Sequence, residues 1–487
     1  MTGIENFVNL EFLYCVGNIL DSHLLIFVSC TRRHPGMKTL HISWLIPLFF
    51  VALFTQCKKE EPEPEPKITD PNFLNALIER GVDQDGDGMI SSSEARSVHI
   101  LDLSSCDISD LSGIEAFVNL DSQLCSYNQL TSLDLSKNKF IRNLRCDRNQ
   151  LTDLDVSGTT NLFEMDCSEN ELNALDVSNN QALHWLECSR NQLSGLDISS
   201  ISSLVYLYCS DNQLSSLDVS NQTYLRYLIC LFNQLTSLDL SNNPDLRSVD
   251  CRHNQLTNMD VTNNTALEFL WCSTNQLTTL DVSNNTNLNE LSCSENQLTE
   301  LDLSTNIALE RLQCSVNLLT ILDASKNLAL EFIGCSGNQL TNLDVSHNSS
   351  LTGITCAVNQ LTSLDISNNP DLDLLHCAEN QLTSLDVSNN TALITLNCDN
   401  NQLTALDVTS NIALINLWCG GNQLTTLDIS KNTSLGVGAG YSTCFLEIEN
   451  MPSLEEVCVW TEPFPPEGFN LCMDGSPNVY FTTECSK

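Results

Sequence analysis

The sequence predicts an α/β repeat protein, a solenoid in which short coils stack side by side and build one parallel β-sheet. Three observations predict this fold. Fifteen cysteines, from Cys125 to Cys419, recur every 21 residues without a break. An asparagine follows each of them after three residues, from Asn128 to Asn422, and an aspartate recurs with the same period, from Asp134 to Asp428. Self-similarity at a fixed period of this length is the signature of a stacked repeat.

The repeat itself reads L-x-x-L-x-C-x-x-N-Q-L-T-x-L-D-V-S-x-N-x-x. Its core is the leucine-rich-repeat signature, with cysteine in the third leucine position. We expect residues such as Leu204, Leu207 and Cys209 to point inward, because one coil alone cannot bury them. Each coil would add a short strand to a parallel concave sheet and a short 3₁₀ or loop segment to the convex side. This solenoid should span residues 101–435, with about fifteen full repeats.

This repeat closely resembles the internalin-type leucine-rich repeats that carry a cysteine ladder. The resemblance covers residues 101 to about 435. It implies a right-handed horseshoe or gently curved solenoid that binds partners on its concave sheet.

Each ladder position has a predicted role. The asparagines should turn inward and bind backbone groups, because buried polar groups need partners. We interpret the aspartates as turn caps rather than a metal-binding stripe. The serine two residues later, such as Ser220, should cap a short helical turn on the convex side. The cysteines should be free, buried thiols, because side chains in register on parallel strands point the same way and make the disulfide torsion awkward.

Two segments precede Cys57. Residues 1–36 include Gly3–Leu10, which nearly repeats Gly113–Leu120, and we interpret them as an over-long upstream extension. Translation would then start at Met37. Residues 37–56 have a short basic start and an apolar stretch, and they resemble a bacterial lipoprotein signal peptide. The alternative, a transmembrane anchor, is disfavoured because the apolar stretch is short and contains a proline.

A lipid anchor and a spacer should follow. The resemblance implies that Cys57 becomes the lipidated first residue. Residues 57–69 form an acidic Glu/Pro linker, which should be extended and hold the domain off a membrane. The charged tetrad directly after Cys57 looks like the surface-export signal of Bacteroidota lipoproteins. We therefore expect an outer-membrane lipoprotein at the cell surface of a Gram-negative bacterium.

A calcium loop precedes the repeats, in a small helical cap at residues 70–100. The segment from Asp83 to Glu94 matches the twelve-residue EF-hand loop. The predicted ligands of one structural Ca²⁺ are Asp83, Asp85, Asp87, the Met89 carbonyl, Ser91 and Glu94. Gly88 would make the sharp turn of the loop. Helices are expected at 71–80 and 93–98, on either side of it. The alternative is an acidic turn without a metal.

The regular repeat pattern ends near residue 436. Residues 436–487 should contain two degenerate coils, at 446–448 and 454–457, and a cap that shields the last sheet edge. Four cysteines leave the register here and allow three different pairings into two disulfides. They are Cys444, Cys458, Cys472 and Cys485.

Charge and composition narrow the possible partners. The formal net charge is −40, with 61 acidic residues against 21 basic ones. This charge argues against nucleic acid and against electrostatic docking on anionic lipid. Membrane contact is expected only through the lipid anchor, and the protein is expected to be a monomer. No catalytic constellation emerges from the scattered histidines, so we predict that it is not an enzyme.

The positions one and three residues before each cysteine should face the concave surface. Aromatic residues are only 6% of the chain, yet they crowd into these positions in four of five successive coils. The predicted ligand-binding residues are Trp185, Tyr206, Tyr208, Tyr227, Phe269 and Trp271. Glu187, Asp250, Arg252 and His253 could add polar specificity. The alternative is that aromatic residues simply favour strands and pair with their neighbours.

Together these features predict a surface binding protein. A protein ligand is favoured, as for an adhesin or receptor. Two alternatives stay open, a lipoprotein that binds glycans and a structural surface spacer.

Overall fold

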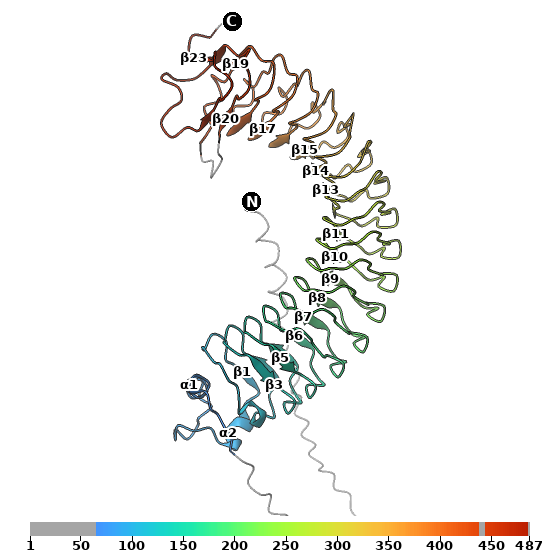
Figure 1. Cartoon of the computed structure of the whole chain (residues 1–487), viewed down its shortest axis with the longest axis vertical. Helices are drawn as coiled ribbons and strands as arrows, with labels where there is room; N and C mark the ends of the chain where they lie inside the picture. Colours follow the sequence, from blue (N-terminus) through green and yellow to red (C-terminus); the bar gives the residue numbers. More distant parts are fainter. Residues whose placement is uncertain (1–64, 438–443, 486–487) are drawn as a thin grey trace, which may run out of the picture. The chain divides into compact units, whose positions relative to one another are not determined.

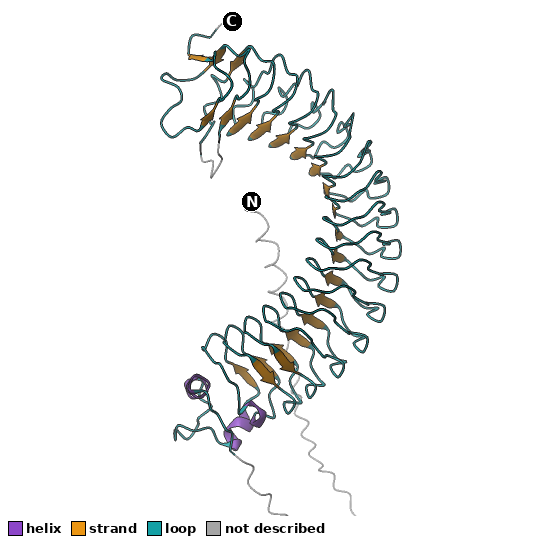
Figure 2. Cartoon of the chain, in the orientation of Figure 1, coloured by secondary structure: helices purple, strands orange, loops and turns teal. Residues whose placement is uncertain are grey.

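The computed structural model is a solenoid whose short strands line the inner side of its curve (Figure 1). Figure 2 shows that most of the remaining chain is turn and loop. The structure describes residues 65–437 and 444–485, which belong to one unit beginning at Glu63. The predictions for residues 1–36 and 37–56, for Cys57 and for the start of the linker lie outside the described residues.

In the described part of the chain the main sheet has 18 strands, all parallel, so the predicted fold class is confirmed. Strands of neighbouring coils pair in the register of the repeat, as Leu207 pairs with Leu228 and Leu228 with Val249. Their order in the sheet follows the chain. The strands are β1 (Ile100–Asp102), β2 (Ser122–Leu124), β4 (Asn143–Arg145), β6 (Glu164–Asp166), β7 (Trp185–Glu187), β8 (Tyr206–Tyr208), β9 (Tyr227–Ile229), β10 (Ser248–Asp250), β11 (Phe269–Trp271), β12 (Glu290–Ser292), β13 (Arg311–Gln313), β14 (Phe332–Gly334), β15 (Gly353–Thr355), β16 (Leu374–His376), β17 (Thr395–Asn397), β18 (Asn416–Trp418), β20 (Leu446–Glu447) and β22 (Leu471–Cys472).

The convex side carries only short sheet fragments. β3 (Ser132–Asp134) pairs with β5 (Asp153–Asp155), and β19 (Thr426–Asp428) pairs with β21 (Glu456–Cys458), which pairs with β23 (Tyr480–Thr482). Within the described residues, the one 3₁₀ helix is η1 (Ile114–Ala116). Elsewhere the convex side is made of hydrogen-bonded turns.

The hydrogen bonds of these turns differ from the predicted serine cap on the convex side. The Asp218 carboxylate accepts the backbone N–H of Ser220 at 2.9 Å, and equivalent bonds recur along the repeat. These bonds hold the pKa of Asp218 below its usual range, chiefly through the hydroxyl and N–H of Ser220. The aspartate therefore caps the turn, as predicted for it, and the serine supplies the donor.

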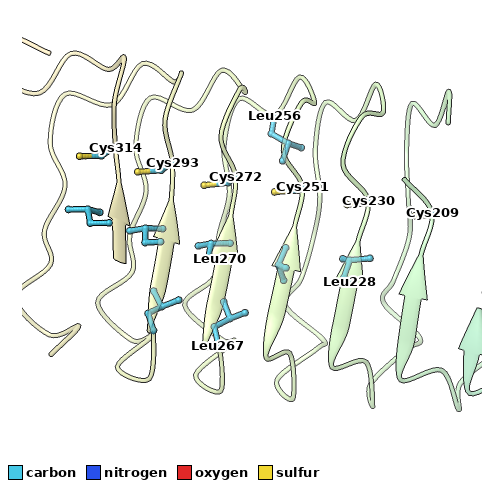
Figure 3. Packing of buried hydrophobic residues seen from close by; sticks show 14 of the residues in the cluster. Cys209, Leu228, Cys230, Cys251, Leu256, Leu267, Leu270, Cys272, Cys293 and Cys314 are labelled. Atoms are coloured by element: carbon cyan, nitrogen blue, oxygen red, sulfur yellow. The ribbon is translucent and has the colours of Figure 1, made fainter. Parts of the chain in front are cut away.

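The core is a stack of leucine, cysteine and valine layers. Figure 3 shows leucines and cysteines of this stack. All fifteen ladder cysteines are buried and free, which confirms the prediction of unpaired thiols. Burial raises the pKa of thiols such as Cys125 and Cys293 to about 12. At neutral pH these sulfurs are protonated, and they act as small apolar fillers.

Two asparagine ladders connect neighbouring coils through hydrogen bonds to the backbone. Asn212 donates to the carbonyl oxygens of Cys188 at 3.1 Å and Cys209 at 3.2 Å, while its Oδ1 accepts from the Leu193 N–H at 3.0 Å. This confirms the predicted inward turn. A second ladder, whose role was not predicted, includes the fully buried Asn243, which donates to Val219 and Gln222 carbonyls at 2.9 and 2.8 Å.

The N-terminal cap has two helices, α1 (Pro71–Glu79) and α2 (Ser92–Ser97). Asp70 caps α1 and also accepts hydrogen bonds from the N–H and hydroxyl of Ser109, at 2.7 and 2.8 Å. The Phe73 ring is fully buried and lies 6.3 Å from the Phe117 ring. These contacts fasten the cap to the first coils.

The C-terminal coils are longer than the repeat. β18 pairs with β20 through Leu417 and Leu446, and β20 pairs with β22 through Leu446 and Leu471. Residues 446–448 and 454–457 therefore belong to one coil rather than the two predicted, because β21 is the convex strand that follows β20. The last coil is β22 with β23. Of the three possible pairings, the disulfides are Cys444–Cys472 and Cys458–Cys485.

Candidate ligand-binding face

Two rows of side chains project from the concave sheet. In each strand from β6 to β9 the central residue is buried and its two neighbours are half-buried, as the alternation of strand side chains requires. The predicted positions one and three residues before each cysteine therefore lie on the concave surface. All six predicted aromatic residues are half-buried there. We call them the aromatic band: Trp185, Tyr206, Tyr208, Tyr227, Phe269 and Trp271.

The band consists of two clusters. On β7 to β9, the rings of Tyr206 and Tyr227 stack with centroids 4.8 Å apart and planes 8° apart. Trp185 and Tyr208 lie 6.0 Å apart at 54°. On β11, Phe269 and Trp271 stack at 5.5 Å. Between the clusters lies β10, whose three residues are all buried.

The aromatic surface extends further than the sequence pattern indicated. His184 stacks on Phe163 with ring centroids 4.9 Å apart and meets the edge of Tyr206 at 5.9 Å. His184 and Phe163 stand directly before their strands, one position outside the concave rows, which is why the pattern missed them. His184 and Tyr206 also line a shallow hollow of about 400 Å³ at the sheet edge, together with Tyr224 and Arg226.

Polar groups border the band. Arg252 makes an ion pair with the buried Asp250 at 2.6 Å, and its guanidinium lies 6.0 Å from the Trp271 ring centroid. The Trp271 indole N–H donates to Glu290 at 2.9 Å. His253, predicted as a polar contact, instead lies exposed on the turn after β10 and stacks on Phe232 at 4.1 Å.

Carboxylates at the other end of the band are partly desolvated. Burial raises the pKa of Glu187 to about 7, against the hydrogen bonds that Ser189 donates to it. Burial also raises the pKa of Asp166, the residue that pairs with Glu187 on the neighbouring strand β6. These two acids lie beside Trp185 and Tyr208.

The predicted calcium loop lies between α1 and α2. Carboxylate oxygens of Asp83, Asp85 and Asp87 lie within 4.8 Å of one another. Asp83 accepts the N–H groups of Gly86 and Gly88, at 2.7 and 3.0 Å. Gly88 has φ 81°, which an L side chain rarely adopts, as expected at the sharp turn.

The other predicted ligands occupy different places. Glu94 accepts the N–H groups of Ser91 at 2.8 Å and Gln84 at 2.7 Å, and these bonds help to hold its pKa at about 2. Ser91 is the N-cap of α2. Met89 is largely exposed, with 65% of its surface accessible. The structure thus brings the three aspartates together, while Glu94 spans the base of the loop.

Solved structures of known proteins share the fold of this chain. No protein-family model and no curated protein matches the chain. Among solved structures, the functional domain of InlJ from Listeria monocytogenes, which includes a cysteine ladder, is 35% identical. The match covers 75% of this chain and 83% of that domain, with a TM-score of 0.69.

Two further structures share the fold at lower identity. The internalin InlF from Listeria monocytogenes is 22% identical over 69% of this chain and 96% of its own, with a TM-score of 0.55. The plant peptide hormone receptor RGFR1, solved in complex with RGF2, is 21% identical over 76% of this chain and 69% of its own, with a TM-score of 0.59. Within the described residues, no helix has the length and apolar character to span a bilayer.

Proposed function

Because the chain belongs to the internalin-type leucine-rich-repeat proteins with a cysteine ladder, we propose that it is a cell-surface protein that binds a protein ligand on its aromatic band. The observation that carries this proposal is the concentration of half-buried rings on neighbouring concave strands. Packing of the core does not need tryptophan or tyrosine on this face, and exposed apolar patches usually mark binding sites. Aromatic residues are also the commonest anchors of protein interfaces.

The form of the face favours an extended ligand. The strands present two rows of side chains, and the hollow that His184 and Tyr206 line beside the band is shallow. Small-molecule sites are usually concave pockets that enclose most of the ligand. A receptor of the same fold is solved with a bound peptide hormone, which is compatible with a polypeptide ligand here.

Glycan binding is the second candidate function. Stacked rings such as Tyr206 and Tyr227 offer flat faces on which sugar rings could also lie. The two ligand classes are separated by one comparison. The full chain is used in a pull-down against exposed surface proteins and, in parallel, on a glycan array. A variant that carries both Trp185→Ala and Trp271→Ala serves as the control in each arm.

A protein captured by the wild type and lost with this variant supports the proposal. Glycans captured in the same dependent way would replace it with glycan binding. Capture of either class that is unaffected by the variant would move the site away from the band.

The N-terminal segment supports our proposal for the cellular location. Cys57 would be lipidated after removal of residues 37–56, which would anchor the solenoid to the outer membrane through the acidic linker. The expected evidence is a lipid-modified Cys57 peptide in mass spectra of native membranes. Peptides from residues 1–36 would contradict this start of the mature chain.

A bound calcium ion would stabilise the N-terminal cap. The donor set fits this ion, because Ca²⁺ takes six to eight hard oxygen ligands and three carboxylates already converge. Asp83, Asp85 and Asp87 would hold it. The Met89 carbonyl, Ser91 and Glu94 would complete the set, and Glu94 would exchange its present hydrogen bonds for the ion.

A further inference from the structure

The concave face around the band carries aromatic and acidic side chains but no basic ones on its outward positions from β6 to β12. From β6 to β12 the two rows offer fourteen outward positions, two on each of seven strands. Six hold the aromatic band, five hold acids, and the remaining three hold Ile229, Ser248 and Ser292. None holds a lysine or an arginine. The acids are Glu164, Asp166, Glu187, Asp250 and Glu290.

Two arginines of the chain show that such a combination of rings and carboxylates attracts cations. At the β10 and β11 end, the Arg252 guanidinium pairs with Asp250 and lies over the Trp271 ring. On the turns next to the sheet, Arg148 lies 4.4 Å from the Tyr127 ring centroid and pairs with Glu169 at 3.0 Å. In both places an arginine interacts with an aromatic ring and with a carboxylate, and the ring quadrupole and the negative charge both attract it.

The β6 to β8 end also places aromatic rings beside carboxylates. Glu187 and Asp166 lie beside Trp185 and Tyr208, and within the described residues no lysine or arginine makes an ion pair with either acid. Two arginines act on these acids from a distance: Arg145 on β4 lowers the pKa of Asp166, and Arg190 on the turn after β7 lowers the pKa of Glu187. Two partly desolvated acids without a paired base favour a cation from outside.

We propose, resting on the proposed function of the band, that the ligand is a cationic segment of polypeptide whose Lys or Arg side chain lies between the Trp185 and Tyr208 rings and the carboxylates of Glu187 and Asp166. The formal charge of −40 would also steer such a ligand toward the chain.

The spacing of the acids indicates how the segment would lie. β6 and β12 are six strand spacings apart, or about 29 Å at roughly 4.8 Å each. An extended peptide rises about 3.3 Å per residue, so about nine residues would span this distance. A segment that crosses the strands with basic residues near both ends would meet Glu187 and Asp166 first and Glu290 last.

The test is a selection of random twelve-residue peptides displayed on phage against the full chain. Selected peptides are then measured against three variants. One replaces the carboxylates (Glu187→Gln with Asp166→Asn), and one replaces the rings (Trp185→Ala with Tyr208→Ala). The matched control, Glu300→Gln with Asp245→Asn, removes two exposed acids away from the concave rows and makes the same change in net charge. Thermal melts establish that each variant is folded.

The inference requires that the selected peptides are rich in lysine or arginine, that either site variant weakens them about tenfold or more, and that added salt weakens them too. The control should bind like the wild type. Neutral or acidic peptides that still depend on the rings would overturn the cationic ligand and leave the proposed function standing. Peptides that bind both site variants like the wild type would overturn both, and a selection that yields no peptide would overturn the cationic segment alone.

Discussion

At the scale of single residues, two buried glutamines differ in a way that affects stability. Gln123 stands at a leucine position of the core, fully buried, and neither its Oε1 nor its Nε2 has a nitrogen or oxygen partner within the described residues. Its amide interacts with the Cys125 thiol, which is a weak hydrogen-bonding group. Gln222 is equally buried, but its Nε2 donates to the carbonyl oxygens of Ile198 at 2.7 Å and Ile201 at 3.1 Å.

Gln123→Leu should therefore raise the free energy of unfolding by about 1 to 2 kcal/mol, because it removes a poorly satisfied buried amide. Gln222→Leu is the matched control and should lower stability, because it removes both hydrogen bonds that the Gln222 amide donates to backbone carbonyl oxygens. Denaturant or thermal unfolding at fixed calcium measures both. If Gln123→Leu proves as destabilising as Gln222→Leu, the Gln123 amide has a strong partner in solution.

Glu187 should make the binding of cationic peptides depend on pH. Burial raises its pKa to about 7, whereas an unfolded glutamate titrates near 4.5. The folded chain therefore retains this proton toward neutral pH, and the group stabilises the fold below 4.5 and loses that contribution as pH rises through about 7. A bound cation needs the ionised form. Affinity for a lysine-containing peptide should thus increase from about pH 6 to about pH 8.

Glu187→Gln should flatten this pH profile. The other titratable or charged groups around Glu187 are Glu164 and Asp166 on β6, Tyr206 and Tyr208 on β8, and His184 and Arg190 on its own coil. A profile that keeps its full slope in the Glu187→Gln variant would show that Glu187 does not control the pH dependence.

Individual residues were predictable where periodicity constrained them. The buried leucines, the free ladder thiols, the inward asparagines and the capping aspartates all follow from the constant period of the repeat. The backbone conformation of the turn after each cysteine could not be predicted from the period. The second residue of that turn has a positive φ in nearly every coil, even for Val316 and Val358, both at 54°. β-Branched residues disfavour this conformation, so their identity hides the turn from sequence reasoning.

At the scale of elements, the N-terminal cap should depend on calcium. The loop joins α1 to α2, and Asp70 ties α1 to Ser109 in the first coils. Because the ion would bind only the folded loop, chelation should lower the melting temperature, and calcium in excess should restore it.

Glu94→Gln should lower the calcium response, but Glu94 also caps α2 through Ser91. Asp85→Asn separates the two effects, because Asp85 lies in the carboxylate cluster and takes no part in that cap. Asp107→Asn, an exposed acid outside the loop, is the control. Melting curves with and without calcium that coincide for the wild type would contradict the site.

The buried thiols of the cysteine ladder should be unreactive in the folded protein. Within the described residues sixteen cysteines are free, and Cys106 is the one that is not buried. In a variant with Cys15, Cys30 and Cys57 replaced by serine, folded protein should react with an alkylating agent at Cys106 alone. Unfolding without a reductant should expose all sixteen thiols. Several reactive thiols in the folded state would show that the core opens locally.

At the scale of the whole solenoid, predictability stopped where the period changed. The sheet continues from β18 into β20 and β22, but the steps from Leu417 to Leu446 and from Leu446 to Leu471 are unequal, so no constant register could be predicted there. Likewise three disulfide pairings stayed open, and the stacking of the last coils brings Cys444 to Cys472 and Cys458 to Cys485. An aromatic cluster that includes Trp460 and Phe464, with rings 5.3 Å apart, packs against this end.

On the concave face, too, some features could be predicted from the repeat and others could not. Strand alternation placed all six band residues on one surface, because every coil repeats the same inward pattern. The pairing of Arg252 with Asp250 and the stacking of His184 depend on rotamers and on neighbours one position outside that pattern. A repeat therefore predicts which side chains share a face, and only the packed structure shows which of them already have partners.

Binding of the ligand at this face is tested by the affinity of single-ring variants for the captured partner. Tyr208→Ala and Trp271→Ala should each weaken binding by about 2 kcal/mol, or roughly thirtyfold, as truncation of an interface anchor does. Phe140→Ala, an exposed ring away from the band, should bind like the wild type. Stability should change little, because both band rings are only half-buried. If both variants bind the partner as tightly as the wild type, the band is not the binding site.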